Sequence, residues 1–167
     1  MALFYLIYNI KGVSIMTSYS LFVGIDIAAK SAAAEWQHSE SDLMQQMDIE
    51  QSKRDYKRLT QKLTKLCHPS QTFVVMEATG TYWMTLALYL YQVGFVVSVI
   101  NPSQGRDFAR AYLKRTKTDA VDAHMLAEFA QVIRTKPWIP PPAICDQLQQ
   151  RLARRDDFIH IKTQERN

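Results

Sequence analysis

The chain has 167 residues, a length that fits one domain plus an appendage. Hydrophobic residues make up 47% of it and charged residues 22%, which is ordinary for a globular protein and excludes a chain too polar to build a core. The net charge of +4 and the pI near 9.1 permit a polyanionic partner without requiring one.

The N-terminal stretch is apolar but lacks the features of a membrane span. ALFYLIYNI, residues 2–10, is too short to cross a bilayer, and neither a preceding charge nor a clear cleavage site marks a signal peptide. Met16 stands just before the first segment that resembles regular structure. We expect residues 1–16 to be an extension outside the fold, with a membrane-associated stub as the weaker alternative.

The two cysteines, Cys67 and Cys145, lie far apart and in no metal-binding spacing. Unpaired structural thiols are typical of a reducing compartment. We therefore expect a cytoplasmic protein without membrane association.

Three strands are predicted before the first helix. SLFVGIDI, residues 20–27, is an apolar run with an acid, Asp26, at its end, one residue before Ile27, and it suits a buried central strand. Residues 31–37 and 42–49 carry weaker strand signals.

The first helix is expected to begin at Ser52, whose hydroxyl can cap it while Asp55 completes a capping box. Its apolar residues recur at helical spacing, with lysines and arginines on the other face: Tyr56, Leu59, Leu63 and Leu66. The segment 68–70 then ends the helix.

A strand, a helix and a further strand follow. TFVVME, residues 72–77, predicts a buried strand that also ends in an acid. Residues 81–93 are apolar enough for a buried helix, which Gly94 closes as a C-terminal cap. Residues 95–100 predict the next strand, and the Asn-Pro pair after them stops it.

The last third of the chain is more polar. Residues 103–117 form a basic, partly helical connector, and Thr118 can cap a helix from Asp119 to about Val132. The inward side of that helix would carry Val121, Met125, Leu126 and Phe129. Consecutive prolines make residues 136–145 a linker without regular structure. Residues 146–167 resume a polar helix, interpreted as the truncated start of a coiled-coil segment.

Strands followed by alternating strands and helices predict an α/β domain with a mixed sheet over residues 17–135. Four acids stand out by position in it: Asp26, Glu77, Asp119 and Asp122. The first two end apolar strands, and the carboxyl ends of strands gather at one edge of such a sheet. The other two lie three residues apart, so they share one face of their helix. All four can therefore converge.

Crowded carboxylates raise one another's pKa unless cations neutralise them. Hard divalent ions with oxygen ligands, Mg²⁺ (or Mn²⁺), fit this need. Two such ions about 4 Å apart form a clamp for phosphodiester chemistry.

Each acid also has a structural explanation. An Asp at a strand end often forms a turn, and acids in a first helical turn favour the macrodipole, so Asp119 and Asp122 could be a solvated helix start. Glu77 is harder to explain in this way, because an acid that ends a buried strand needs a partner. We interpret His124 as a packing or surface residue.

A basic run leads into the last helix: Arg106, Arg110, Lys114, Arg115 and Lys117, with a single acid among them. Such a run is usually a solvated face. Because this one precedes the candidate metal helix, contact with the phosphates of a nucleic acid is the competing interpretation.

These motifs together resemble a known family. FVGIDIAAK, followed by MEATGTYWMTLALYLYQVGFVVSVINPSQGRDFARAYLKRTKTDAVDA, is similar to the amino-terminal domain of the DEDD-type insertion-sequence transposases. These mobile-element recombinases are related to the pilin-gene invertases, and their first domain is similar to the RuvC Holliday-junction resolvase. The resemblance spans about residues 20–135 and joins GID, EATGxYW, the NP turn and KTDxxDA in order.

The resemblance implies a ribonuclease-H-like fold, a five-stranded mixed sheet flanked by helices. It also implies that Asp26, Glu77, Asp119 and Asp122 are a catalytic, Mg²⁺-binding tetrad that acts on DNA. The implied partners are DNA, a structured guide RNA and further copies of full-length transposase in a homo-oligomer. The basic run would face the nucleic acid.

Full-length members carry a second domain beyond a long coiled-coil helix, and that domain supplies a serine nucleophile. These 167 residues contain no counterpart of it, so we expect a truncated transposase whose own enzymatic activity is open. A non-catalytic nucleic-acid-binding remnant that interferes with intact copies is the alternative. An actin-like nucleotide-binding domain is disfavoured, because AAKSAAAEW has one serine and no glycine after the first strand.

Overall fold

The computed structural model describes residues 18–111 and 119–142, with the backbone alone for residues 119–122. The expectations for residues 1–16 and 146–167, for Thr118 as a helix cap, and for three of the five basic residues fall outside these ranges. No helix in the described part of the chain is long and apolar enough to cross a membrane.

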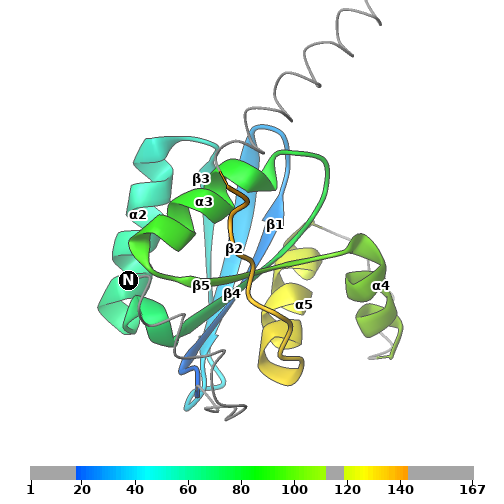
Figure 1. Cartoon of the computed structure of the whole chain (residues 1–167). Helices are drawn as coiled ribbons and strands as arrows, with labels where there is room; N and C mark the ends of the chain where they lie inside the picture. The colour runs from blue at the N-terminus through cyan, green and yellow to red at the C-terminus, as the bar shows by residue number, and fades with distance from the viewer. Residues whose placement is uncertain (1–17, 112–118, 143–167) are drawn as a thin grey trace, which may run out of the picture.

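A five-stranded mixed sheet forms the centre of the domain, as Figure 1 shows. Its strands are β1 (Leu21–Ile27), β2 (Ser31–His38), β3 (Met44–Glu50), β4 (Thr72–Glu77) and β5 (Val96–Ile100), in the spatial order β3-β2-β1-β4-β5. The pairs β1–β4 and β4–β5 are parallel, whereas β2 is antiparallel to both β1 and β3. The predicted mixed sheet and the ribonuclease-H-like architecture are confirmed.

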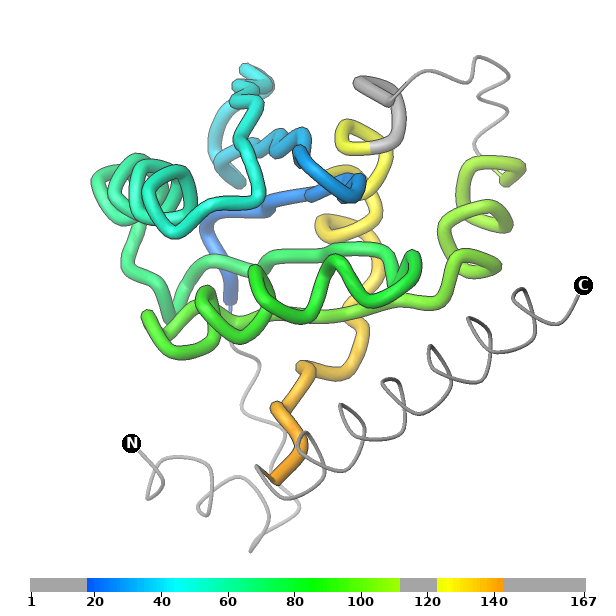
Figure 2. Tube along the Cα trace, turned by 90° about the horizontal axis from the view of Figure 1, so that it is seen from above, coloured from blue at the N-terminus to red at the C-terminus, as the bar shows by residue number. Residues whose placement is uncertain are grey.

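Helices cover both faces of this sheet (Figure 2). On one side lie α2 (Lys53–Leu66) and α3 (Trp83–Val93), and on the other lies α5 (Asp119–Val132) with α4 (Pro102–Ala111) beside it. A short 3₁₀ helix, η1 (Pro69–Gln71), leads into β4.

Two hydrophobic cores result, because successive side chains of a strand point to opposite faces. Val23, Ile25 and Val74 face the core formed with α2 and α3. Phe22, Phe73 and Val75 alternate with them and face the core formed with α4 and α5. The central strands β1 and β4 are thus buried on both sides, which explains their nearly continuous apolar sequences.

The start of α2 follows the prediction in part. Ser52 is its N-cap, and the Ser52 hydroxyl accepts a hydrogen bond from the Asp55 amide at 3.2 Å. The reciprocal half of the capping box is wrong, because the Asp55 carboxylate accepts instead from the Glu50 amide and from Arg58. These two hydrogen bonds lower the pKa of Asp55 below its ordinary value of 3.8, and the bond from the Glu50 amide has the larger effect. Leu66 is also a wrong prediction, since it is exposed at the helix end.

The later elements differ from prediction mainly at their ends. Gly94 has a φ of 102°, the left-handed conformation that a helix C-cap favours and glycine tolerates. The described part of the connector is helical, as predicted, and α4 begins at Pro102, where a fixed φ suits a first helical turn. Residues 136–142, the described part of the proline-rich segment, have no regular structure. Within them Trp138 acts as an anchor, because its backbone amide donates to the Val97 carbonyl of β5 and its ring meets the ring of Trp83 edge-on.

The backbone of α5 lies directly on β1 at Gly24. A Cβ at this position would come within 2.2 Å of the Ala123 carbonyl oxygen and of the Ala127 amide nitrogen. Only a glycine therefore allows the helix to approach the strand this closely. Ala123 and Ala127 are themselves completely buried, which shows how small side chains keep the two elements together.

The variant Gly24→Ala tests this contact. We expect it to lower the free energy of unfolding by about 3 kcal/mol, because overpacking against backbone atoms forces α5 away from the sheet. Urea unfolding followed by circular dichroism measures the change. Gly105→Ala is the matched control, since its new methyl group would meet side chains alone; an equal stability loss in both variants would contradict the prediction.

Candidate metal-binding site

Two of the four predicted acids lie side by side at the carboxyl ends of neighbouring parallel strands. Asp26 and Glu77 are the residues that follow the last registered pair of β1 and β4, Ile25 with Met76. By the alternation of side chains, Asp26 shares the face of Gly24, and Glu77 shares the face of Val75. This is the face that α5 covers. Both carboxylate side chains are half-buried.

The helix that carries the other two acids begins toward the same edge. His124 contacts Glu35, which is paired with Gly24 of β1. Gln131, seven residues later in α5, contacts Gln37, which is paired with Phe22, nearer the start of β1. Helix α5 therefore runs antiparallel to β1, and its first turn lies toward the carboxyl end of that strand. Asp119 and Asp122 belong to this first turn, and the positions of their side chains lie outside the description.

The surroundings of Glu77 come from two further elements. The Thr79 hydroxyl donates a hydrogen bond to the Glu77 Oε1 at 3.2 Å. A Cβ on Gly105 of α4 would lie 3.1 Å from the Glu77 Oε2. The carboxylate thus fits against a glycine in a buried position of the helix, and any larger residue there would crowd it.

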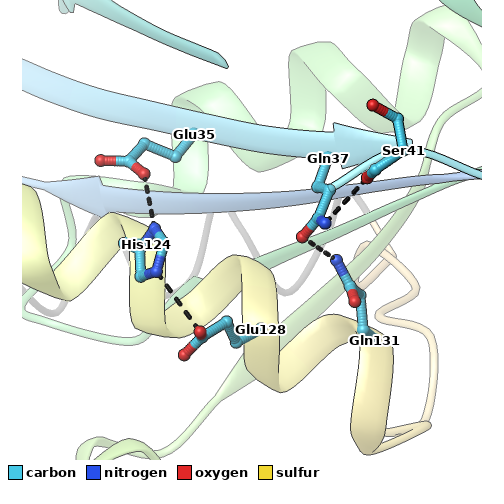
Figure 3. A network of polar contacts seen from close by, with 6 residues as sticks. All are labelled: Glu35, Gln37, Ser41, His124, Glu128 and Gln131. Atoms are coloured by element: carbon cyan, nitrogen blue, oxygen red, sulfur yellow. Dashed lines mark hydrogen bonds and ion pairs between the residues drawn. The ribbon is translucent and has the colours of Figure 1, made fainter. Parts of the chain in front are cut away.

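A polar network joins α5 to β2 beside the acids (Figure 3). His124 places Nδ1 3.1 Å from the Glu35 Oε2 and Nε2 3.3 Å from the Glu128 Oε1. Glu35 is only 7% exposed, so it needs this partner. The Gln131 side-chain Nε2 donates to the Gln37 side-chain Oε1 at 2.6 Å, and the Gln37 Nε2 donates in turn to the Ser41 backbone carbonyl. The network fixes how far α5 can slide along the sheet.

The described part of the basic run is exposed. Arg106 and Arg110 lie one turn apart on the outer side of α4, opposite the buried Phe108. Arg110 approaches Asp107 at 3.6 Å, and both side chains are more than 70% exposed, so the pair restrains the arginine weakly. Lys114, Arg115 and Lys117 lie outside the described residues.

Within the described side chains, no three carboxylate, imidazole or thiol groups come together as a metal-binding cluster. The chemistry of the donors that are described suits a hard cation, because Asp26 and Glu77 offer carboxylate oxygens from one face of one sheet edge. Mg²⁺ characteristically takes one or two protein carboxylates and completes its shell with water or phosphate oxygens. The two strand acids fit that requirement.

Sequence reasoning missed several residues around this edge. It gave no role to Gly24, Glu35 or Gly105, and it left His124 without a partner. A glycine inside a helical pattern, as at Gly105, is a usable signal for close packing. Glu35 gave no comparable signal, because its partner is 89 residues away in the sequence.

Comparison with known proteins gives a family match over most of the chain. Residues 23–167 match the transposase family of the DEDD type called IS110. The pilin gene-inverting proteins of Moraxella bovis and Moraxella lacunata are 37% and 35% identical over 71 residues. That segment is 42% of this chain and 22% of each relative, so the match spans less than a quarter of their length.

Solved structures with a similar fold include Thermus thermophilus RuvC, with a TM-score of 0.47 and 13% identity over 71% of this chain and 99% of that one. The fowlpox virus Holliday junction resolvase has a TM-score of 0.40 and 15% identity over 68% and 99%.

The contact between Glu35 and His124 can be tested by a double-mutant cycle. We expect His124→Ala to lower the free energy of unfolding by about 1–2 kcal/mol, because it leaves a buried carboxylate without its partner. Adding Glu35→Gln should recover part of that loss. Urea unfolding of both single variants and the double variant measures the coupling.

Glu128→Gln is the control for this cycle, since it removes the more exposed of the two carboxylates beside His124. Its expected effect is below about 0.5 kcal/mol. Strictly additive losses in the Glu35–His124 cycle would show that the contact does not stabilise the fold.

Proposed function

Because this chain belongs to the IS110-type DEDD transposase family, we propose that it binds Mg²⁺ (or Mn²⁺) at the carboxyl edge of its sheet and acts on DNA phosphodiesters during transposition. The observation that carries the proposal is the placement of Asp26 and Glu77. They lie near the carboxyl ends of two adjacent parallel strands on one face of the sheet, with the start of α5 directed toward them.

The proposed ligands are Asp26, Glu77, Asp119 and Asp122. Bound Mg²⁺ would supply a positive charge that activates a nucleophile and stabilises the leaving oxygen of a phosphodiester. The protein residues have separate tasks. The Thr79 hydroxyl orients the Glu77 carboxylate, and the glycine contact with α5 holds the helix that bears the two aspartates close to the sheet.

Arg106, Arg110, Lys114, Arg115 and Lys117 are the proposed contacts to nucleic-acid phosphates. Arg106 and Arg110 support this role, because both are exposed on α4, the helix that also approaches Glu77 through Gly105. Cations beside a metal edge attract the same polyanion that the metal binds. A structured guide RNA, assembly with full-length transposase and a cytoplasmic location are further parts of the proposal.

The proposal extends to recombination by this polypeptide itself. That step goes furthest beyond the comparisons, since the curated relatives are much longer than the matched segment. The competing function is a nucleic-acid-binding domain without catalysis that joins intact copies in mixed oligomers. Both functions predict DNA binding, and they differ in whether the acids bind a metal ion.

Calorimetric titration of Mg²⁺ and Mn²⁺ into the full chain tests the metal site. We expect Asp26→Asn and Glu77→Gln each to weaken binding at least tenfold, because each removes one charged ligand. Asp119→Asn/Asp122→Asn should have a comparable effect. Asp107→Asn, which removes an exposed acid from α4, is the control with equal charge change. Identical isotherms for the wild type and the acid variants would show that these acids do not form a metal site.

Gly105→Ala tests the position of Glu77 without removing a ligand. We expect Mg²⁺ binding to weaken several-fold, because the new methyl group displaces the carboxylate by a few tenths of an ångström. Stability should not fall, since alanine is favoured over glycine in a helix by about 1 kcal/mol. Titration together with urea unfolding separates the two effects. Unchanged metal affinity would show that α4 does not determine where Glu77 lies.

A further inference from the structure

The solvent face of α2 is cationic along its whole length. Its exposed basic residues are Lys53, Arg54, Lys57, Arg58, Lys62 and Lys65. The single acid of this helix, Asp55, is buried and accepts hydrogen bonds from the Glu50 amide and Arg58. The outer surface of α2 therefore presents positive charge without an exposed acid on the same helix.

This arrangement works against the stability of the helix. Three pairs of like charges lie four residues apart, Lys53 with Lys57, Arg54 with Arg58, and Arg58 with Lys62, and such pairs are destabilising. Lys53 and Arg54 also stand in the first turn, where the macrodipole disfavours cations. A helix face that only needs hydration would gain from alternating signs. The uniform sign is explained if a polyanion covers the face.

A groove lies beside this face at the edge of the sheet. Met47 of the edge strand β3 and Arg58, Gln61, Lys62 and Lys65 of α2 line a volume of about 370 Å³. The ammonium group of Lys62 lies 4.8 Å from the centre of the Trp36 ring, a cation–π contact that restrains this lysine. The groove thus combines one apolar side chain, Met47, with three cations, of which Lys62 is held in place.

The cationic face begins at the same edge of the domain as Asp26 and Glu77. The Gln51 amide donates to the Lys30 carbonyl, and the Gln51 side chain donates to the Ala28 carbonyl, directly after β1. Helix α2 then leads away from that edge on the sheet face opposite α5 (Figure 2). From Lys53 to Lys65 the rise is about 18 Å.

We propose that the exposed face of α2 binds the phosphate backbone of duplex DNA that flanks the metal edge. An axial length of about 18 Å of duplex contains about five base pairs and ten phosphate charges, enough to face all six cations of the helix. The choice of DNA as the polyanion rests on the proposed function. The binding itself requires no metal ion.

The test is the salt dependence of binding to a fluorescein-labelled 30-base-pair DNA duplex, measured by anisotropy on the full chain in EDTA. Each phosphate contact contributes about 0.9 to the slope of log affinity against log salt concentration. We expect Lys57→Gln/Lys62→Gln to reduce the slope by about 1.8. The charge-preserving Lys57→Arg/Lys62→Arg should retain the wild-type slope. Lys136→Gln, an exposed lysine elsewhere, should also leave it unchanged.

Equal slopes for Lys57→Gln/Lys62→Gln and the wild type would overturn the proposal, as would an equal drop in Lys136→Gln. A double-stranded RNA of the same sequence is the second probe, and a loss confined to RNA would overturn the assignment to DNA. Asp26→Asn/Glu77→Gln should keep its salt slope. This variant separates failure of the α2 surface from failure of the metal site.

Discussion

The contact between Gly24 and the backbone of α5 sets the geometry of the whole domain. Strand β1 is the centre of the sheet, and it can hold a helix at backbone distance only because one residue lacks a side chain. Through this contact the first turn of α5 is held near the end of β1. The approach of this first turn to the end of β1 therefore depends on a residue that has no side chain.

The two faces of the sheet differ in the polarity of the side chains that they bury. The face under α2 and α3 buries apolar side chains, and its packing supplies most of the hydrophobic core. The face under α5 includes polar positions, Asp26, Glu35, Gln37 and Glu77, within an otherwise apolar interface. Buried polar contacts add little net stability, but they penalise alternative registers, because a shifted helix would leave a carboxylate unpaired. Glu35 with His124 fits that role.

The carboxyl edge of the sheet is where the proposals meet. Glu77 is reached by Gly105 of α4, whose outer side carries Arg106 and Arg110, and the cationic face of α2 begins at this edge from the opposite side of the sheet. A nucleic acid centred on the acids would thus meet positive charge in two directions. The attraction would also be long-ranged enough to steer the polyanion to the edge before contact.

Local patterns in the sequence determined the five strands, the cap at Ser52, the C-cap at Gly94 and the bounds of α5, because alternation, helical spacing and capping depend on neighbours a few residues away. They also determined that Asp26 and Glu77 end buried strands. Two local predictions were wrong. Leu66 is exposed, and the second half of the capping box is not formed because the amide of Glu50 in β3 donates to the Asp55 carboxylate instead. Only the tertiary structure decided that Gly24 receives α5, that Gly105 adjoins Glu77 and that His124 pairs with Glu35. These contacts join segments far apart in the chain, and periodicity tells which face a residue occupies but not which distant residue meets it.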